Sequence, residues 1–528
     1  MSGVQQTTDN DTPYTRGEDS GQNQWTWQHY NATVGYDGTF GRHVVSASAG
    51  ILYNIYKTDF SQNGAAGKMV EYRHMTVNGA VNYAYDDRYV ATFSFAADGS
   101  DNYRPGNRWG FYPSLGLGWI VSRERFLRDS RMVDLLKLRA SVGKNGWDPM
   151  GEMRYLWEGY YTGRGGLNTG NSEHTWHGGT ALSYLPNPDV FAEKSLKYDA
   201  GIDLRLWNRL SLNVDLFLEK RSGIVTQDWM IPGASGVDNP PYRNIGRMTN
   251  KGFEVQLSWA DRIGDFNYAL TGMASYNSNK VDYMAEVVTV PTAARTGRRL
   301  DALFGYVADG FYDWDDFDVG GELREGLPKP TFGAVQPGDI KYKNLNGDTV
   351  IDENDQTAIG DSYLPKLQYS FSLAASYKGF DLFALFQGAA GRDVNLLDAP
   401  LQNIAFRDNG NVYGIAEGRW AYYPEQGIDT RATAIYPRLS LQDNSNNYRN
   451  STLWKRSGDF LKLRNVELGY TFAQPSLSKA GISKIRIYLS GVNLLTVSRL
   501  MRDYDIDPEI LSGHPALKSY NLGLTVTF

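Results

Sequence analysis

The sequence contains no cysteine, and this excludes disulfide bonds, thiolate metal sites and thiol chemistry. It also has no apolar run near the ~18 residues that a transmembrane helix needs, so helices do not carry it across a membrane. Its 53 basic residues are outnumbered by 59 acidic ones, and the net charge of −6 gives no basic footprint for nucleic acid. Residues 1–24 are polar and lack the apolar core of a secretion signal. Membrane-spanning strands stay compatible with this composition, because half of each strand is polar.

In many stretches of the chain, apolar and polar residues alternate. In the run SLKYDAGIDLRLW every second residue from Tyr198 to Leu206 is apolar, and the residues between them are mostly charged. A short connection at Asn208 and Arg209 follows, and a second alternating run begins at Leu210. Successive side chains of a strand point to opposite faces, so this segment is predicted to be a hairpin with one apolar and one polar face. Each run has about ten residues, enough for a tilted strand to cross a bilayer.

The same alternation predicts fifteen strands, and the connections between them follow a pattern. From the seventh strand onward, short turns alternate with long connections, which is typical of outer-membrane barrels with short periplasmic turns and long external loops. Aromatic residues are frequent, at 13%, and suit the girdles of such a barrel, although they also suit soluble sugar-binding β proteins. The predicted fold class is therefore all-β, a transmembrane antiparallel β-barrel. The predicted strands are 27–37, 43–57, 72–86, 89–98, 109–122, 134–145, 195–207, 210–222, 251–261, 266–280, 366–378, 380–390, 459–472, 482–494 and 518–528.

The strand count also predicts how the chain is divided. If the last strand ends in the periplasm, counting back an odd number of strands places residues 1–26 outside the cell as a polar segment. Bacterial single-chain barrels have an even number of strands, so residues 27–528 are expected to be only part of a barrel. The long extracellular loops are predicted at 146–194, 223–250, 281–365, 391–458 and 495–517.

Several stretches resemble one family. They include FYPSLGLGWIVSRERFLRDSRMVDLLKLRASVGKNG, FGYVADGFYD and FLKLRNVELGYTF, followed by SGVNLLTVSRLMRDYDIDPEI and SYNLGLTVTF at the end. In this order and over most of the chain, they resemble the TonB-dependent outer-membrane transporters of the SusC/RagA (starch-utilisation-type) group.

The resemblance implies a barrel of about 22 strands, preceded by a plug domain and a TonB-interacting segment, of which this chain matches the C-terminal barrel portion. It implies a SusD-like surface lipoprotein as a lid, the TonB complex as the energy source through the N-terminal region, and the outer membrane of a Gram-negative bacterium as the location. The imported substrates would be oligosaccharides, or in some cases peptides. The alternatives are a soluble, secreted carbohydrate-binding β protein and a passive porin or adhesin.

One stretch has the spacing of a calcium-binding loop. Oxygen donors stand at the first, third, fifth, ninth and twelfth positions of a twelve-residue loop, with a backbone carbonyl at the seventh. Two features depart from the pattern, namely Asn at the first position and Thr349 where glycine normally makes the turn. The alternative is a loop whose Asn and Asp side chains bond to their own backbone. No other cofactor is expected. The candidate ligands are Asn344, Asn346, Asp348, Val350, Asp352 and Asp355.

Aromatic residues in the predicted loops are candidate sugar-stacking residues, or else loop packing and lid contacts. They are Trp147, Trp157, Tyr160, Trp176, Trp420 and Tyr423. Polar residues such as Asp203, Arg205, Asp215 and Glu254 are predicted to line the lumen. The sequence has no nucleophile elbow and no phosphate-binding loop, so we predict a transporter wall and no enzyme.

The final strand is predicted to carry the assembly signal. Every second residue from Tyr520 to Phe528 is apolar, and the chain stops on the aromatic Phe528. In outer-membrane proteins of this kind, the barrel-assembly machinery reads such a terminal strand; the alternative is an ordinary sheet edge.

Overall fold

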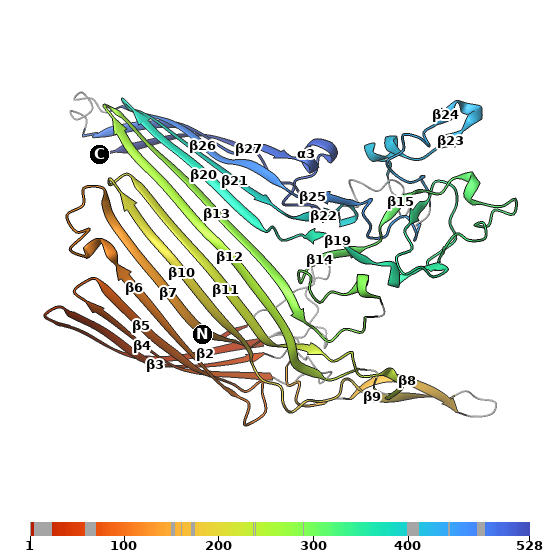
Figure 1. The fold of residues 1–528 in the computed structure, drawn as a ribbon, viewed down its shortest axis with the longest axis horizontal. Coiled ribbons are helices and arrows are strands. Elements are labelled where there is room, and N and C mark those ends of the chain that lie inside the picture. Colours follow the sequence, from red (N-terminus) through yellow and green to blue (C-terminus); the bar gives the residue numbers. More distant parts are fainter. Residues whose placement is uncertain are drawn as a thin grey trace. The chain divides into compact units, whose positions relative to one another are not determined.

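The computed structural model describes residues 2–4, 24–58, 70–148, 154–159, 161–169, 175–235, 237, 239–288, 290–398, 411–441, 444–472 and 481–528. Among them, almost all regular structure is β-strand, and sixteen strands follow one another in a single hydrogen-bonded order (Figure 1). No helix in this part of the chain is long and apolar enough to span a membrane. The strands of this order are β1 (Ser2–Val4), β2 (Gln24–Phe40), β3 (His43–Thr58), β4 (Val70–Tyr85), β5 (Tyr89–Ser100), β6 (Trp109–Ile120), β7 (Val133–Trp147), β10 (Glu193–Leu206), β11 (Leu210–Gln227), β12 (Tyr242–Ile263), β13 (Phe266–Tyr283), β20 (Leu367–Tyr377), β21 (Phe380–Ala390), β26 (Phe460–Phe472), β27 (Lys484–Ser498) and β28 (Ser519–Thr527).

All fifteen predicted strands are present, and most boundaries agree within a few residues. The largest difference concerns β12, which begins at Tyr242 and not at residue 251. Together with the extension of β11 to Gln227, this reduces the predicted loop 223–250 to residues 228–241. The early part of β12, YRNIGRMTN, has no strict alternation. Apolar and polar residues alternate where one face of a strand has apolar surroundings and the other polar ones. Where a strand continues beyond surroundings of this kind, the alternation is lost.

The N-terminal region differs from the prediction in a similar way. Residues 24–26, placed in the polar segment 1–26, form the beginning of β2. Ser2–Val4 form the short strand β1, which pairs antiparallel with β2. Three residues are too few for any periodic signal.

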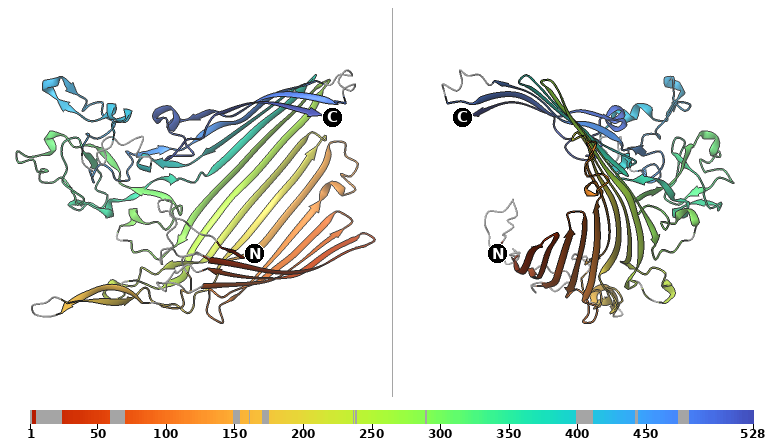
Figure 2. Two further views of the ribbon diagram at one scale, coloured as in Figure 1. Left: turned by 180° about the vertical axis from the view of Figure 1, so that it is seen from behind. Right: turned by 60° about the vertical axis from the view of Figure 1, so that its left-hand side comes forward.

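The chain divides into two compact units. Unit 1 comprises Met1–Asp203, Asp215–Lys251 and Asp282–Val287, and unit 2 comprises Leu204–Val214, Gly252–Val281 and Val288–Phe528. In unit 1, β2 to β7 pair in chain order, and Figure 2 shows these red and orange strands side by side. In unit 2, β13, β20, β21, β26, β27 and β28 pair in the same consecutive way.

The long connections have structure of their own. The connection after β7 contains the hairpin of β8 (Tyr161–Thr169) and β9 (Thr175–Leu182), and the connection after β27 contains the short helix α3 (Arg499–Tyr504). The other short strands are β14 (Ala302–Gly305), β15 (Ala308–Phe311), β16 (Lys329–Pro330), β17 (Ile340–Tyr342), β18 (Val350–Ile351), β19 (Thr357–Ser362), β22 (Asp393–Asn395), β23 (Tyr422–Tyr423), β24 (Ile428–Asp429) and β25 (Lys455–Ser457).

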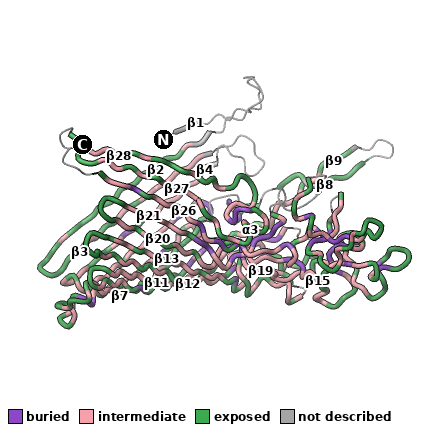
Figure 3. The backbone as a smooth tube through the Cα atoms, turned by 90° about the horizontal axis from the view of Figure 1, so that it is seen from above, coloured by how far each residue is buried: buried purple, intermediate pink, exposed green. Residues whose placement is uncertain are grey.

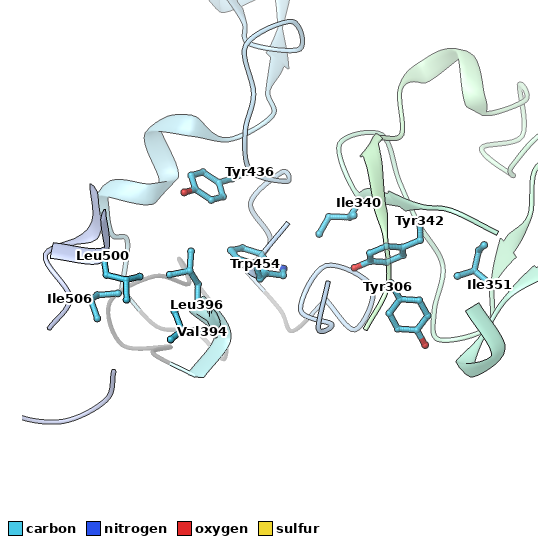
Figure 4. Packing of buried hydrophobic residues seen from close by; sticks show 10 residues of the cluster. All are labelled: Tyr306, Ile340, Tyr342, Ile351, Val394, Leu396, Tyr436, Trp454, Leu500 and Ile506. Atoms are coloured by element: carbon cyan, nitrogen blue, oxygen red, sulfur yellow. The ribbon is translucent and has the colours of Figure 1, made fainter. Parts of the chain in front are cut away.

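Burial is concentrated in these connections and not in the long strands. Figure 3 shows the strands mostly half-buried or exposed, while the buried residues gather around α3 and β19. The largest buried cluster of unit 2 contains residues from three connections, those between β13 and β20, between β21 and β26 and between β27 and β28 (Figure 4). Burying one such aliphatic side chain contributes about 1.5–3 kcal/mol. The cluster consists of Tyr306, Ile340, Tyr342, Ile351, Val394, Leu396, Tyr436, Trp454, Leu500 and Ile506.

Candidate functional site: the polar wall and its connections

An arginine on β7 joins two carboxylates from neighbouring strands of unit 1. Arg139 donates to both carboxylate oxygens of Asp215 on β11, with Nη2 at 2.7 Å from Oδ2. It also donates through Nε and Nη2 to Asp203 on β10, each 3.2 Å from Oδ1. Asp203 and Asp215, predicted from alternation to line the lumen, are therefore brought together by a cation that the prediction did not name.

This contact depends on a glycine of β10. A Cβ atom built on Gly201 would lie 2.6 Å from Cζ of Arg139 and 2.7 Å from Oδ1 of Asp215. A Cβ at this position would force the ends of the Arg139 and Asp215 side chains to move, because real Cβ contacts essentially never occur at such distances. The guanidinium therefore lies directly over the backbone of Gly201 and reaches the strand beyond it.

Unit 2 contains a second arrangement of the same kind. Arg486 on β27 donates to Asp381 on β21, with Nε at 3.1 Å from Oδ1, and to Glu467 on β26, with Nη2 at 2.6 Å from Oε1. A Cβ on Gly469 of β26 would lie 2.6 Å from Nη2 of Arg486. In both units, an arginine crosses a glycine to reach a carboxylate two strands away. The two arrangements are called the arginine clamps below.

The clamps fix charge on the polar face of the strands. Each arginine is bound by two carboxylates, and charge-assisted, multidentate pairs of this kind are among the strongest hydrogen bonds in proteins. The other predicted wall residues differ from them: Arg205 is exposed, and Glu254 accepts a hydrogen bond from the hydroxyl of Ser275 at 3.3 Å. These contacts provide a rigid polar surface.

The predicted calcium loop forms a hydrogen-bonded turn between β17 and β19. Asp355 is fully buried, and its two oxygens accept backbone N–H groups of Leu345 and Asp352 at 2.7 and 2.9 Å. Asp348 accepts the backbone N–H of Val350 at 2.8 Å, and Asn344 accepts that of Gly347 at 2.6 Å.

The turn is made at Gly347, whose φ is 78°, and not at Thr349. In the described part of the chain, no three His, Asp or Glu side chains converge on a possible metal position. Each side-chain oxygen of the candidate ligands accepts a hydrogen bond, either from a backbone N–H group or from a side-chain amide. Calcium binding stays a prediction.

The predicted aromatic residues have different surroundings. In unit 1, Trp147 and Trp176 are exposed, Trp176 by 60%, while Trp157 is half-buried with its ring edge-on to Tyr155 at 6.5 Å. Tyr160 lies outside the described residues.

In unit 2, Tyr423 on β23 is exposed, but Trp420 is only 7% exposed. The ring of Trp420 packs against the backbone of Gly338, where a Cβ would lie 2.5 Å away, so in this structure its face is not available for stacking. The position of Trp420 between two predicted strands does not reveal that its side chain is buried.

The terminal strand has the predicted two faces. β28 is the last strand of the hydrogen-bonded order and pairs with β27, with Tyr520 opposite Gly491 and Leu524 opposite Ile487. Tyr520 is exposed, and Phe528 is 85% exposed. Recognition by the assembly machinery stays a prediction.

A buried ion network of unit 2 was missed by the sequence analysis. Lys462 on β26 is 1% exposed and donates to both oxygens of Asp507, at 2.7 and 2.9 Å, and to Glu509 at 2.7 Å. Arg464 also binds Glu509. The network attaches the connection between α3 and β28 to the strand β26. The sequence does show an acidic run, DIDPEI, and two basic residues in FLKLR, which could have suggested ion pairs. The alternation of apolar and polar residues, however, does not show which charged residues pair.

Comparison with known proteins gives a consistent result. The family model for the β-barrel of TonB-dependent receptor-like proteins matches residues 2–494. The TonB-dependent receptors P3 and P26 of Formosa agariphila are 26% and 29% identical over 93% and 90% of this chain, covering 51% and 48% of their own lengths. The TonB-dependent receptor SusC of Bacteroides thetaiotaomicron is 26% identical over 85% of this chain and 43% of its own length. This chain thus spans about half the length of the curated relatives it matches.

Solved structures show the same fold. The RagAB peptide transporter superposes with a TM-score of 0.70 at 21% identity, over 96% of this chain and 56% of that chain. The RagAB importer in its open-open state gives a TM-score of 0.71. The two-faced antiparallel strands, the short turns and the long structured connections agree with these matches, and the chain belongs to the TonB-dependent receptor family, with the β-barrel fold of its SusC/RagA group.

Proposed function

We propose that this chain forms barrel wall in an outer-membrane transporter that imports oligosaccharides, energised through TonB and covered by a SusD-like surface lipoprotein. The observation that supports this best is the pair of arginine clamps on a face opposite to exposed apolar side chains. On β6, for example, Leu115, Leu117 and Trp119 are exposed on one face. An apolar outer face and a charged inner face are what a lipid-embedded, water-filled wall requires.

The proposed mechanism is transport without covalent chemistry. The carboxylates of the clamps are held in ion pairs by Arg139 and Arg486, so they serve as fixed wall charges and not as a free acid and base. The structured connections would bind the substrate, and movement of a plug by TonB would open the path. In this proposal the barrel lies in the outer membrane of a Gram-negative bacterium, and β28 directs its assembly there.

Peptide import is the second candidate. The solved RagAB complex is titled a peptide transporter, but its 21% identity to this chain supports the fold and not the substrate. A passive porin or adhesin, and a soluble secreted sugar-binding protein, are the remaining alternatives.

Uptake by cells tests the proposal. The gene would be expressed with its adjoining coding regions, and import of labelled oligosaccharides and of labelled peptides of similar mass measured with and without functional TonB. We expect oligosaccharide uptake that is lost without TonB. Uptake that persists without TonB would indicate a passive pore, and uptake of peptides alone would overturn the substrate class. A chain that stays monodisperse in buffer without detergent would contradict the membrane wall itself.

A further inference from the structure

A recess of about 450 Å³ lies in unit 2 between β22, β25 and α3. Basic side chains dominate its lining, with four cations against two carboxylates, which leaves an excess of two positive charges. Nothing in the transport wall described above uses these residues. The charged residues that line the recess are Lys455, Arg456, Arg499, Arg502, Asp393 and Asp503.

Both carboxylates of the recess are already engaged. Asp393 lies 3.7 Å from Nζ of Lys455 and also accepts the backbone N–H of Asp361 at 2.7 Å. Asp503 is bound by Arg502 in a two-pronged pair, at 2.6 and 3.1 Å. The positive charge that remains belongs to the other two arginines.

Arg456 is a partly buried cation without an ion-pair partner among the described residues. Its guanidinium donates to the hydroxyl of Tyr504 at 2.6 Å and to the backbone carbonyls of Leu453 and Lys455 at 2.7 and 2.8 Å. All these acceptors are neutral, and the carboxylate of Asp503, which Arg502 binds directly, interacts with Arg456 only at longer range. Removing a charge from water is costly unless an opposite charge compensates it.

Arg499 adds a second cation that forms no ion pair of its own among the described residues. It is the first residue of α3, it is exposed, and it forms no hydrogen bond or ion pair within the part of the chain that the structure describes. An anion that entered the recess would therefore meet two guanidinium groups that share the charge of Asp503 at longer range with Arg502, its direct partner.

The recess is built on a packed base and needs little reorganisation. Leu500 of α3 is fully buried beside Ile506 and Leu396 (Figure 4), and the hydroxyls of Tyr504 and Tyr436 are 2.9 Å apart. Arg456 is held in place by its hydrogen bonds, and a preorganised cation loses less conformational entropy when it binds a ligand. Guanidinium groups also match the planar geometry of carboxylates and the tetrahedral oxygens of sulfate.

We propose that this recess binds an oxyanion, the carboxylate or sulfate group of an acidic sugar in the imported oligosaccharide. The inference rests on the proposed function for the identity of the sugar, whereas the oxyanion site itself rests on the charges. A volume of 450 Å³ lies within the range of small-ligand sites.

Binding to the purified full chain in detergent tests the proposal without requiring transport. The probes are a galacturonic acid trisaccharide, its methyl-esterified neutral counterpart, a trisaccharide with one sulfate ester, and an acidic tripeptide, each measured by calorimetry. We expect both acidic sugars to bind at least tenfold more tightly than the ester, and inorganic sulfate to compete. The variant Arg499→Ala should weaken acidic-sugar binding at least tenfold, because that side chain has no structural partner to disturb.

A matched control separates charge from general disturbance of α3. The double variant Arg502→Ala/Asp503→Ala removes a neutral pair from the same rim, so it should change binding less than threefold. Equal binding of acid and ester, or an Arg499→Ala variant that binds like wild type, would overturn the site. Tighter binding of the tripeptide than of either sugar would overturn the sugar assignment. Oligosaccharide uptake is measured separately, so a failed site leaves the transport proposal standing, and failed transport leaves the oxyanion site standing.

Discussion

Arg139 reaches Asp215 across the backbone of Gly201, so a guanidinium on β7 binds a carboxylate on β11 although β10 lies between them. The three residues depend on one another: Gly201 leaves space for the guanidinium, Arg139 extends across it, and Asp215 binds the guanidinium. Arg486, Gly469 and Asp381 are arranged in the same way.

Replacing Gly201 by alanine should therefore destabilise the wall. The added methyl group would lie 2.6 Å from Cζ of Arg139 and displace the guanidinium from Asp215, at a cost of about 1–3 kcal/mol in the free energy of unfolding. The control is Gly272→Ala on β13, where a Cβ meets nothing within 4 Å. Urea unfolding from lipid vesicles measures both variants, and equal stabilities would contradict the clamp.

The two faces of β12 give a second prediction from adjacent residues. Leu257 is 46% exposed on the apolar face, and Gln256 points to the opposite, polar face. Leu257→Arg places a charge toward lipid and should cost about 2–4 kcal/mol if the residue lies near mid-bilayer, whereas Gln256→Arg should cost less than 1 kcal/mol. The same vesicle assay reports both values. A larger cost for the Gln256 variant would reverse the assignment of the faces.

The Lys462 network should respond strongly to the loss of its cation. Lys462→Met leaves Asp507, itself buried, without its partner, and breaking a buried pair in this way costs about 3–5 kcal/mol. The double variant Lys462→Met/Asp507→Leu removes both charges and should recover part of that loss. Hydrogen exchange of residues 505–517 measures the attachment directly. A single variant as protected as wild type would show that the connection is held by other contacts.

The same network predicts a sign for acid sensitivity. Burial by itself raises the pKa of Glu509, but hydrogen bonds from Arg464 and Lys462 outweigh it and hold the pKa below its usual value. A carboxylate with a lowered pKa stabilises the folded state at neutral pH, and this contribution disappears as the pH falls through the lowered value. The protection factors of residues 505–517, which correct for the intrinsic pH dependence of exchange, should therefore fall in acid, below the pH at which an ordinary glutamate titrates. The Glu509→Gln variant should exchange faster at neutral pH and lack this acid step.

The loop from Asn344 to Asp355 provides a test of calcium binding. Asp355→Ala leaves two partly buried N–H groups without an acceptor, which should cost about 1–3 kcal/mol in all. Because the side-chain oxygens already accept hydrogen bonds, we expect a chelator to leave the unfolding temperature of the unaltered protein unchanged. A temperature that falls on chelation and recovers with added calcium would instead establish the metal site.

The sequence predicted the long strands well and their surroundings poorly, for a physical reason. A strand such as β11 has lipid-compatible side chains on one face, so its period of two is visible along the chain. The early residues of β12 have no such one-sided surrounding, and their strand was assigned to a loop. Asp203 and Asp215 were placed correctly on the polar face, but Arg139 was not assigned to them, because alternation says nothing about which strands become neighbours.

The connections were the hardest part to predict. Trp420 and Tyr423 stand three residues apart between the same predicted strands, yet one is buried and the other exposed. Their environments depend on distant partners, such as Gly338 for Trp420, and no local period reports such contacts. The recess between β25 and α3 was invisible for the same reason.

The buried cluster shared by the connections of unit 2 has a consequence for engineering. Its side chains come from three connections, those between β13 and β20, between β21 and β26 and between β27 and β28, and they pack together as in the interior of a small globular protein. A single connection grafted from a relative would leave gaps against the other two, so recognition in this unit would be exchanged only by transplanting all three connections together. Among relatives, the sequences of these connections should then change together, while the long strands stay similar.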